Sequence, residues 1–464
     1  MTNDMNQANP PRIMIAGSGS GCGKTTVTCA VLGAFKERGI AVSSFKCGPD
    51  YIDPMFHSEI IGANARNLDL FLMKKQGTLY SLATNSLNSR LSVIEGVMGF
   101  YDGVGSTADY SSWALSNDTK TPVVVVLNCK GMSLTVCALL QGLRDFKPNR
   151  ISGVILNQVK SPQMAEYYQK MIEAHTGLRV YGYLPPMPEV SLESRHLGLV
   201  TAAEVSRLQE MIHALAVQAE KTLDLDGLMK LAGTAEPFSY NEISIRFQTR
   251  VRIGIAKDKA FCFYYRDGLD LLIRMGAELV EFSPLTDKKL PDGISGVIFG
   301  GGYPELYLKQ LSGNFEMLES IRSAWKDGMP VYGECGGFIY LQERFIGRDG
   351  TAYSLVGLIN SASKMTDRLQ RFGYVTLTAQ TDNLLCKKGD QISAHEFHYA
   401  DSERCGDAFL AKKESSGVTY PCVVTQDHLV AGYPHLHFYA SPDFAERLLR
   451  ACAAYQEKRG QKRL

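Results

Sequence analysis

Short apolar runs alternate with segments of helical periodicity through the first half of the chain. The first run, residues 13–16, precedes a glycine-rich turn, and the helical pattern of residues 27–38 follows it. Further buried strands are predicted, in chain order, at residues 40–46, 91–94, 123–127, 151–156 and 180–184. Strands that alternate with helices predict a doubly wound parallel sheet with right-handed crossovers.

The periodicity is lost over residues 232–240 and then starts again. Strands are predicted at residues 252–256, 278–282 and 296–299, with a helix near residues 264–275. We therefore predict two α/β domains, 1–235 and 251–464, joined by a linker at 236–250.

The composition narrows the class of protein. The 464 residues are 45% hydrophobic and 21% charged with a formal net charge of +1, which indicates a globular protein without a surface for nucleic acid. The polar N-terminus does not predict a secretory signal, and the longest apolar runs are too short to span a membrane. The 11 cysteines include no C-x-x-C pair, so reduced thiols and a cytoplasmic location are expected.

Residues 17–26 read Gly-Ser-Gly-Ser-Gly-Cys-Gly-Lys-Thr-Thr, between a predicted strand and a predicted helix. Glycines let backbone N–H groups form an anion cradle, Lys24 can reach the outer phosphates of a nucleotide, and the Thr25 hydroxyl can bind Mg²⁺. Ser18 stands where the general pattern has its first glycine, so the loop is one residue longer and points to a subgroup. The predicted ATP-binding residues of this loop are Gly17, Ser20, Gly21, Gly23, Lys24, Thr25 and Thr26.

Polar residues follow several of the other predicted strands, at the edge where ligands bind in open α/β sheets. The loop after residues 40–46 begins with Lys46 and contains Asp50 and Asp53, and Glu95 directly follows the strand at 91–94 as a second candidate for Mg²⁺. Asn157 either hydrogen-bonds a nucleotide base or forms a turn.

The loop that follows the last of these strands contains a positive pair, Arg195 and His196. We expect this pair to contact an anion.

The second half contains a candidate nucleophile. Cys335 lies in Gly-Glu-Cys-Gly-Gly, between a strand and an apolar helix, which resembles a nucleophile elbow. Backbone N–H groups of Gly301, Gly302 and Gly336 are predicted to form an oxyanion hole. His435, in Pro-His-Leu-His, is the predicted base for Cys335.

Together these motifs resemble the cobyrinic acid a,c-diamide synthase family over nearly the whole chain. The segments that carry the resemblance are residues 46–54, Lys-Cys-Gly-Pro-Asp-Tyr-Ile-Asp-Pro, and residues 95–99, Glu-Gly-Val-Met-Gly. The resemblance implies a P-loop NTPase-like N-terminal domain of the dethiobiotin-synthetase kind and a C-terminal class I glutamine amidotransferase domain.

The family's chemistry is the ATP- and glutamine-dependent conversion of two acetate side chains of cobyrinic acid, or a related tetrapyrrole, into acetamides. By resemblance, Lys46 contributes to the ATP site and Asp50 and Asp53 lie near the substrate carboxylate. Thr25, Asp53 and Glu95 would carry Mg²⁺. A homodimer is also implied.

This chain departs from other triad amidotransferases at the residue that would orient His435. Other triad amidotransferases have a glutamate two residues after the histidine, where this chain has His437, a pattern the family shares. His437 or a carboxylate elsewhere could take that role, and a dyad is the third alternative. The segment His395–Tyr399 also matches the family and is expected near the domain interface or the substrate.

Three alternatives stay open at this stage. A relative that amidates nickel-sirohydrochlorin has nearly the same motifs. Cobyric acid synthase fits less well, because Asp-Tyr-Ile-Asp-Pro is not its pattern. A P-loop ATPase switch would not need the second domain.

Overall fold

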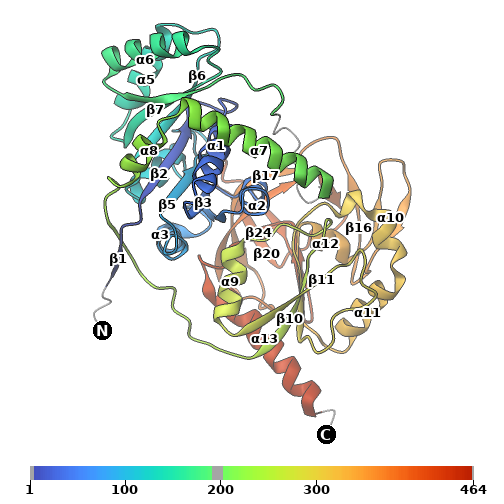
Figure 1. Cartoon of the computed structure of the whole chain (residues 1–464). Helices are drawn as coiled ribbons and strands as arrows, with labels where there is room; N and C mark the ends of the chain where they lie inside the picture. Colours follow the sequence, from blue (N-terminus) through green and yellow to red (C-terminus); the bar gives the residue numbers. More distant parts are fainter. Residues whose placement is uncertain (1–4, 191–201, 462–464) are drawn as a thin grey trace. The chain divides into compact units, whose positions relative to one another are not determined.

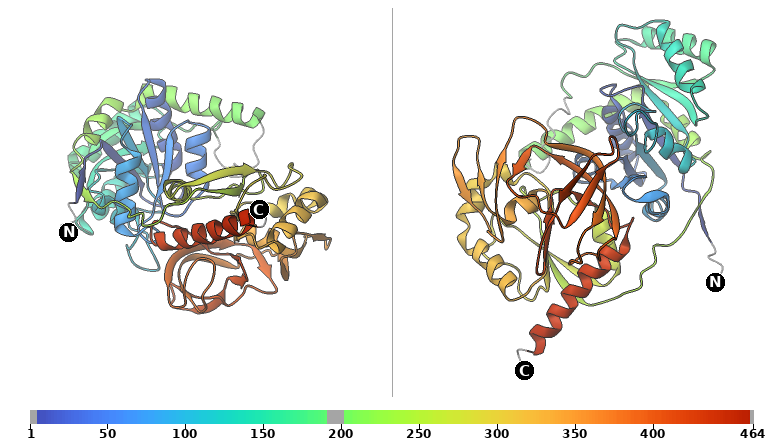
Figure 2. Two further views of the ribbon diagram at one scale, coloured as in Figure 1. Left: turned by 90° about the horizontal axis from the view of Figure 1, so that it is seen from below. Right: turned by 180° about the vertical axis from the view of Figure 1, so that it is seen from behind.

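The computed structural model describes residues 5–190 and 202–461, with the side chains of residues 202–204 also outside the description. The chain divides into two compact units, one up to Glu242 and one from Ile243 (Figures 1 and 2). The predicted anion contact of Arg195 and His196 lies outside the described residues.

The first unit is built on a seven-stranded sheet in the order β4-β3-β5-β2-β6-β7-β8. Every neighbouring pair is parallel, which confirms the predicted doubly wound sheet. The strands are β2 (Arg12–Gly17), β3 (Val42–Cys47), β4 (Asn64–Leu68), β5 (Leu91–Glu95), β6 (Val123–Asn128), β7 (Ile151–Asn157) and β8 (Arg179–Leu184).

Helices cover both faces of this sheet. Ile13 and Ile15 of β2 belong to the apolar core on one face, and Met14 and Ala16 belong to the core on the other, as the two-residue repeat of a strand requires. Helices α1 and α7 pack side by side (Figure 1). The helices are α1 (Lys24–Glu37), α2 (Ile52–Glu59), α3 (Lys74–Asn85), α4 (Ser112–Asp118), α5 (Thr135–Asp145), α6 (Pro162–Thr176), α7 (Ala202–Thr222) and α8 (Leu225–Ala232).

Part of the predicted linker belongs to the first unit. Residues Phe238–Tyr240 form β9, which pairs antiparallel with β1 (Asn6–Ala8). The buried guanidinium of Arg12 donates to the backbone oxygens of Thr119 and Glu236 and lies 4.9 Å from the centre of the Phe238 ring. These contacts hold part of residues 232–240 in place, the segment in which the sequence showed no periodicity.

The second unit contains a six-stranded sheet in the order β11-β10-β12-β13-β23-β22. It is parallel except for the pair of β22 and β23. Its strands are β10 (Val251–Ala256), β11 (Ala277–Phe282), β12 (Gly296–Phe299), β13 (Val331–Glu334), β22 (Val424–Gln426) and β23 (Leu429–Gly432). Its helices are α9 (Arg266–Arg274), the 3₁₀ helix η2 (Pro304–Leu306), α10 (Leu308–Gly313), α11 (Phe315–Lys326), α12 (Gly336–Leu341) and α13 (Pro442–Gln461).

Two further sheets complete this unit, and no pattern in the sequence predicted them. A four-stranded sheet contains β15 (Ala352–Ser354), β14 (Gln342–Ile346), β16 (Ile359–Met365) and β19 (Ala400–Ser402). An antiparallel five-stranded sheet contains β21 (Thr419–Cys422), β20 (Phe409–Lys413), β17 (Arg371–Ala379), β18 (Gln391–His398) and β24 (His435–Leu436). The short strand β24 places His435 in this last sheet.

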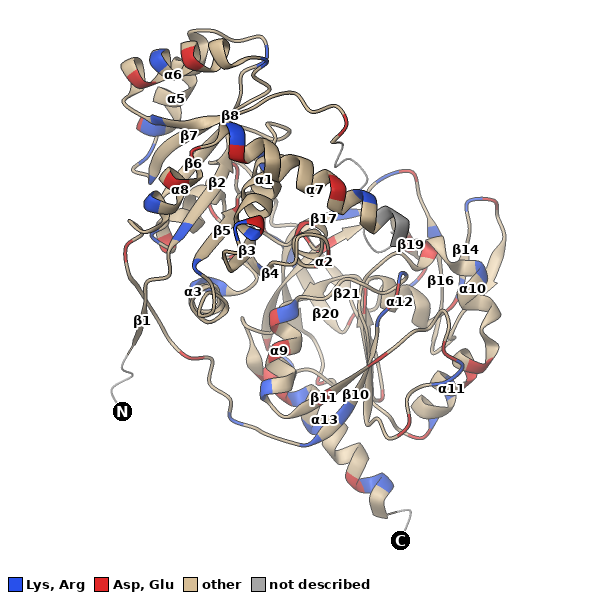
Figure 3. Ribbon diagram, in the orientation of Figure 1, with Lys and Arg blue, Asp and Glu red and all other residues tan. Residues whose placement is uncertain are grey.

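Basic and acidic residues are interspersed along both units in Figure 3. In the described part of the chain, no helix combines the length and the apolarity that a membrane crossing requires.

The turn after β13 is close-packed on β12. A Cβ atom added at Gly337 would lie 2.1 Å from the carbonyl oxygen of Phe299, whereas one added at the exposed Gly313 would meet nothing within 4 Å. We predict that Gly337→Ala destabilises the protein by about 1 to 3 kcal/mol. Gly313→Ala, at the end of α10, should change stability by less than about 1 kcal/mol. Calorimetry of the full chain checks both, and equal melting temperatures for the two variants would contradict the packing argument.

Candidate active sites

The glycine-rich loop connects β2 to α1. Gly21 and Gly23 have φ of 72° and 98°, a region that favours glycine, and Gly23 is the N-cap of α1. The ammonium of Lys24 donates to the carbonyl oxygen of Gly19 at 3.0 Å. The residues of this loop that were predicted to bind ATP therefore form one continuous turn at the N-terminus of α1, where an anion is favoured.

Asn157, at the end of β7, supports this loop. Its Nδ2 donates to the carbonyl oxygen of Cys22 at 2.9 Å. A Cβ atom at Gly23 would lie 1.9 Å from that nitrogen. The amide of Asn157 is thus directed at the loop backbone, a role that the sequence interpretation did not include.

A buried charge cluster lies at the ends of β3 and β5. Oε1 of Glu95 accepts hydrogen bonds from the Thr25 hydroxyl and from Nζ of Lys46, both at 2.7 Å. Lys46 also contacts Oδ2 of Asp53 at 2.5 Å. Glu95 is fully buried and Lys46 nearly so. The structure therefore brings together four predicted side chains from three segments of the sequence: Thr25, Glu95 and the pair Lys46 and Asp53.

His57 also belongs to this cluster, although the sequence analysis assigned it no role. Its Nδ1 lies 2.7 Å from Oγ of Ser44, and its Nε2 lies 3.4 Å from Oε2 of Glu95. It follows Asp53 by one helical turn on α2, so the i, i+4 spacing was the signal available.

The two aspartates of this region differ in their electrostatics. Burial and the charge of Asp53 raise the pKa of Asp50 to about 7. Burial also raises the pKa of Asp53, but the charge of Lys46 outweighs it and lowers that pKa to about 2. Lys46 itself is buried, yet Glu95 and Asp53 keep its pKa above the ordinary value. An ionised Asp53 and a partly protonated Asp50 therefore lie side by side at neutral pH.

Oxygen atoms suited to Mg²⁺ are present. The Thr25 hydroxyl and the Glu95 carboxylate are adjacent, and such hard oxygen donors are the ligands that Mg²⁺ prefers. Among the described residues, no group of three or more His, Cys, Asp or Glu side chains is arranged to hold a metal ion. In P-loop sites generally, phosphate oxygens and water supply further ligands to Mg²⁺.

In the second unit, Cys335 occupies a strained turn between β13 and α12. Its φ of 48° and ψ of −100° are unusual for a residue other than glycine. The turn is held by its own backbone, because the Cys335 N–H donates to Gly432 O at 2.7 Å. Cys335 is the N-cap of α12, so its thiol lies at a helix N-terminus.

His435 lies beside this cysteine. Its buried ring hydrogen-bonds the Cys335 side chain, and its Nδ1 lies 3.5 Å from Oε2 of Glu334. Burial lowers the pKa of His435, but the charges of Cys335 and Glu334 outweigh it and raise the pKa to about 10. The arrangement can hold a thiolate and an imidazolium together.

The glycines predicted to form an oxyanion hole border the same centre. A Cβ atom at Gly336 would lie 3.1 Å from the amide nitrogen of Gly302, and one at Gly301 would lie 2.5 Å from Cε1 of His435. Within the described residues, the amide groups of Gly302 and Gly336 have no backbone acceptor. Both remain available to an oxyanion.

His437 does not orient His435. Its ring packs on Tyr265 and Tyr439, and its Nδ1 accepts the Tyr439 N–H at 3.3 Å. Burial lowers the pKa of His437 to about 3, so the ring is neutral. Of the three alternatives that the sequence left open, a carboxylate elsewhere and a Cys–His dyad therefore remain.

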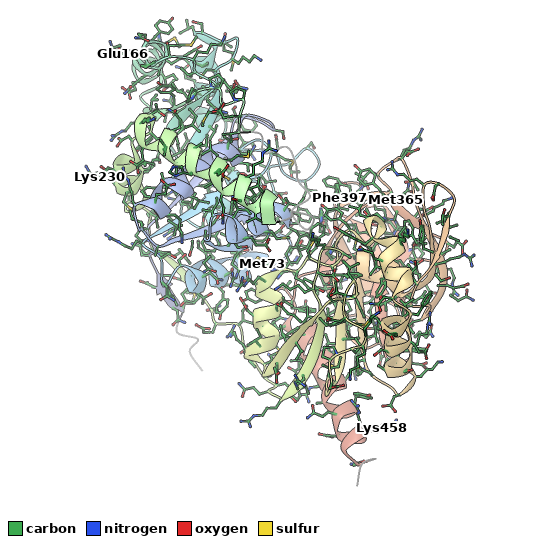
Figure 4. All side chains as sticks on the ribbon, turned by 45° about the vertical axis from the view of Figure 1, so that its right-hand side comes forward. Met73, Glu166, Lys230, Met365, Phe397 and Lys458 are labelled. Carbon is green, nitrogen blue, oxygen red and sulfur yellow. The ribbon has the colours of Figure 1, made fainter. Side chains whose placement is uncertain are left out.

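Most of the segment His395–Tyr399 belongs to β18, which ends at His398, and its side chains alternate between the two faces of that strand. His395 is opposite His435 in the register of β18 and β24. The exposed side chain of Phe397, labelled in Figure 4, packs edge-on against Phe372 and Tyr399. Glu396, on the buried face, accepts the Tyr420 hydroxyl. The expected place of this segment, near the domain interface or the substrate, stays a prediction.

Comparison with known proteins identifies both units. Residues 13–200 match the CobQ/CobB/MinD/ParA nucleotide binding domain, and residues 252–443 match the CobB/CobQ-like glutamine amidotransferase domain.

Relatives named cobyrinate a,c-diamide synthase match almost the whole chain. The one from Caldanaerobacter subterraneus subsp. tengcongensis is 37% identical, over 96% of this chain and 99% of its own. The one from Clostridium acetobutylicum is 40% identical, over 94% of this chain and 99% of its own. The one from Listeria innocua is 39% identical, over 93% of this chain and 97% of its own. With both domains matched and the full length shared, the chain belongs to the cobyrinate a,c-diamide synthase family.

Proposed function

We propose that this protein uses ATP and glutamine to convert the a and c acetate side chains of cobyrinic acid into acetamides, a step of cobalamin biosynthesis. The observation that carries the proposal is the pairing of a phosphate loop with a Cys–His centre in one chain whose full-length relatives bear that activity as their name.

The phosphate-loop unit would activate the substrate. A carboxylate is a poor electrophile, so transfer of the γ-phosphoryl group of ATP would convert it into an acyl phosphate with a good leaving group. Lys24 and Lys46 would stabilise the charge that develops on the phosphoryl oxygens. Bound at Thr25 and Glu95, Mg²⁺ would supply further charge stabilisation.

The Cys–His unit would supply the nitrogen. The Cys335 thiolate attacks the side-chain amide of glutamine, and the N–H groups of Gly302 and Gly336 stabilise the oxyanion. His435 protonates the leaving –NH₂ group, which departs as ammonia when the C–N bond breaks. Water then hydrolyses the γ-glutamyl thioester. Ammonia attacks the acyl phosphate, and inorganic phosphate leaves as the amide forms.

Mass spectrometry of the product tests the substrate. The protein is incubated with ATP, Mg²⁺ and glutamine, with cobyrinic acid in one reaction and nickel-sirohydrochlorin in another. Two successive carboxylate-to-amide mass changes on cobyrinic acid support the proposal. The same changes on the nickel macrocycle alone, or no amidation of either compound, would overturn it.

The nucleophile can be tested separately from the ligase. We predict that Cys335→Ala lowers glutamine hydrolysis at least about 1000-fold, because the variant lacks the thiol that would form the thioester. Synthesis with ammonium salts in place of glutamine should stay within about twofold of the wild type, since the ATP site is untouched. Glutamine-dependent synthesis that survives at the wild-type rate would show that Cys335 is not the nucleophile.

Thr25→Val removes the hydroxyl next to Glu95 and keeps the shape of the side chain. We predict that synthesis falls about 100-fold or more with either nitrogen source, because metal-assisted charge stabilisation is worth several kcal/mol, while Cys335 remains intact. Thr28→Val is the matched control. Thr28 lies one turn later on α1, and its buried hydroxyl has no hydrogen-bond partner in the part of the chain that the structure describes. The steady-state rate of synthesis is measured for both variants. Equal losses in the two would contradict the role of Thr25.

A further inference from the structure

Glu334 is the last residue of β13 and directly precedes the nucleophile. Its carboxylate is held from two sides. The Tyr332 hydroxyl and the Leu436 N–H both donate to Oε1, the latter at 3.1 Å. The other oxygen, Oε2, faces Nδ1 of His435 at 3.5 Å.

We propose that Glu334 is the positioning carboxylate of a Cys335–His435–Glu334 triad, in the place that a glutamate two residues after the histidine has in other triad amidotransferases. The inference rests on the proposed glutamine hydrolysis and deepens it.

The strained turn explains how two consecutive residues can reach one ring. Successive side chains in a regular strand point to opposite faces, so Glu334 and Cys335 would diverge if β13 simply continued. The positive φ of Cys335 ends the strand and redirects the chain. As a result, both side chains contact His435.

The two donors to Oε1 determine the orientation of the carboxylate. Leu436 is the neighbour of His435 on β24, so its N–H ties Glu334 to the strand that bears the base. Tyr332 lies two residues before Glu334, on the same side of β13. With Oε1 occupied in this way, Oε2 is left to face the imidazole, which fixes the ring as a bound carboxylate does in other triads.

The other titratable groups around His435 do not provide this contact. Burial lowers the pKa of His395 to about 3 and that of His398 to about 4, so both rings are neutral. Glu396 is engaged by Tyr420 and lies near Arg371. The carboxylate of Glu334, by contrast, lies at ion-pair distance from His435.

The charge of Glu334 also sets the expected pH dependence. The reactive state holds a protonated His435, and activity is lost at high pH when that proton leaves. Removing the negative charge makes the imidazolium less stable, which lowers its pKa. The basic limb of the glutaminase pH profile must then move to lower pH.

Glu334→Gln in the full-length protein tests the proposal, because it keeps the size of the side chain and removes the charge. We expect kcat for glutamine hydrolysis to fall about 100-fold or more, and the basic limb to move down by at least about one pH unit. Ammonia-dependent synthesis should stay within about twofold, which reports that the remainder of the protein is intact.

Two further variants separate the effect of the carboxylate's charge from the effect of its orientation and from that of the substitution itself. Tyr332→Phe loosens the carboxylate but leaves its charge, so we expect a loss below about tenfold with the basic limb unmoved. Glu319→Gln, on the exposed surface of α11, is the matched control for the substitution itself and should behave as the wild type.

The outcomes distinguish the two proposals. A wild-type protein that does not hydrolyse glutamine refutes the proposed function. A wild type that hydrolyses glutamine, beside a Glu334→Gln variant with an unchanged rate and pH profile, refutes the role of Glu334 alone. If Glu334→Gln does not fold, the wild-type profile decides: a basic limb above pH 8 supports the triad, and one near the ordinary imidazole pKa of about 6.5 overturns it.

Discussion

The ion pairs of Lys46 hold together the ligand-facing edge of the first unit. Its ammonium lies between Glu95 and Asp53 in a region where each charge would be costly alone. Removing one partner from such a buried group typically costs about 3 to 5 kcal/mol. The cluster joins the ends of β3 and β5 to the first turn of α1, so the phosphate loop and the acidic loop are positioned by the same interaction.

Buried ion pairs position the candidate site of the first unit, whereas a strained backbone turn positions that of the second. Cys335 is held at a positive φ by the hydrogen bond of its N–H to Gly432 and by the packing of Gly337 against β12. This conformation presents the thiol at a helix N-terminus beside His435. The two units thus reach a reactive arrangement by different means, although both place it at the carboxyl end of a parallel sheet.

The sequence was most informative where local patterns determine local structure. Apolar runs predicted the parallel strands, and glycine spacing predicted both the phosphate loop and the turn at Cys335. Strand β4 was missed because Asn64, Arg66 and Asn67 interrupt its apolar pattern. The side chain of Asn67 donates a hydrogen bond to Gly48 O. Hydrogen bonds of this kind cannot be predicted from the hydrophobic periodicity of the sequence.

Roles that depend on contacts between distant segments could not be predicted. Asn157 supports a loop that lies 135 positions earlier in the chain. Glu334 was overlooked because a residue next to the nucleophile in a regular strand would point away from it. His437 was considered because it occupies the expected position, yet its aromatic surroundings keep it neutral and away from His435.

The proposed nucleophile and its proposed base are attached to different sheets. Cys335 follows β13 of the six-stranded sheet, while His435 lies on β24 of the five-stranded sheet. The junction between the two sheets is short, because β23 ends at Gly432 and β24 begins at His435, and the Leu436 N–H bonds Glu334 across it. Because β23 pairs with β13 and is followed so closely by His435, the distance between sulfur and imidazole is tied to the pairing of these two strands. The geometry around the thiol thus depends on strand pairing as well as on the side chains that contact it.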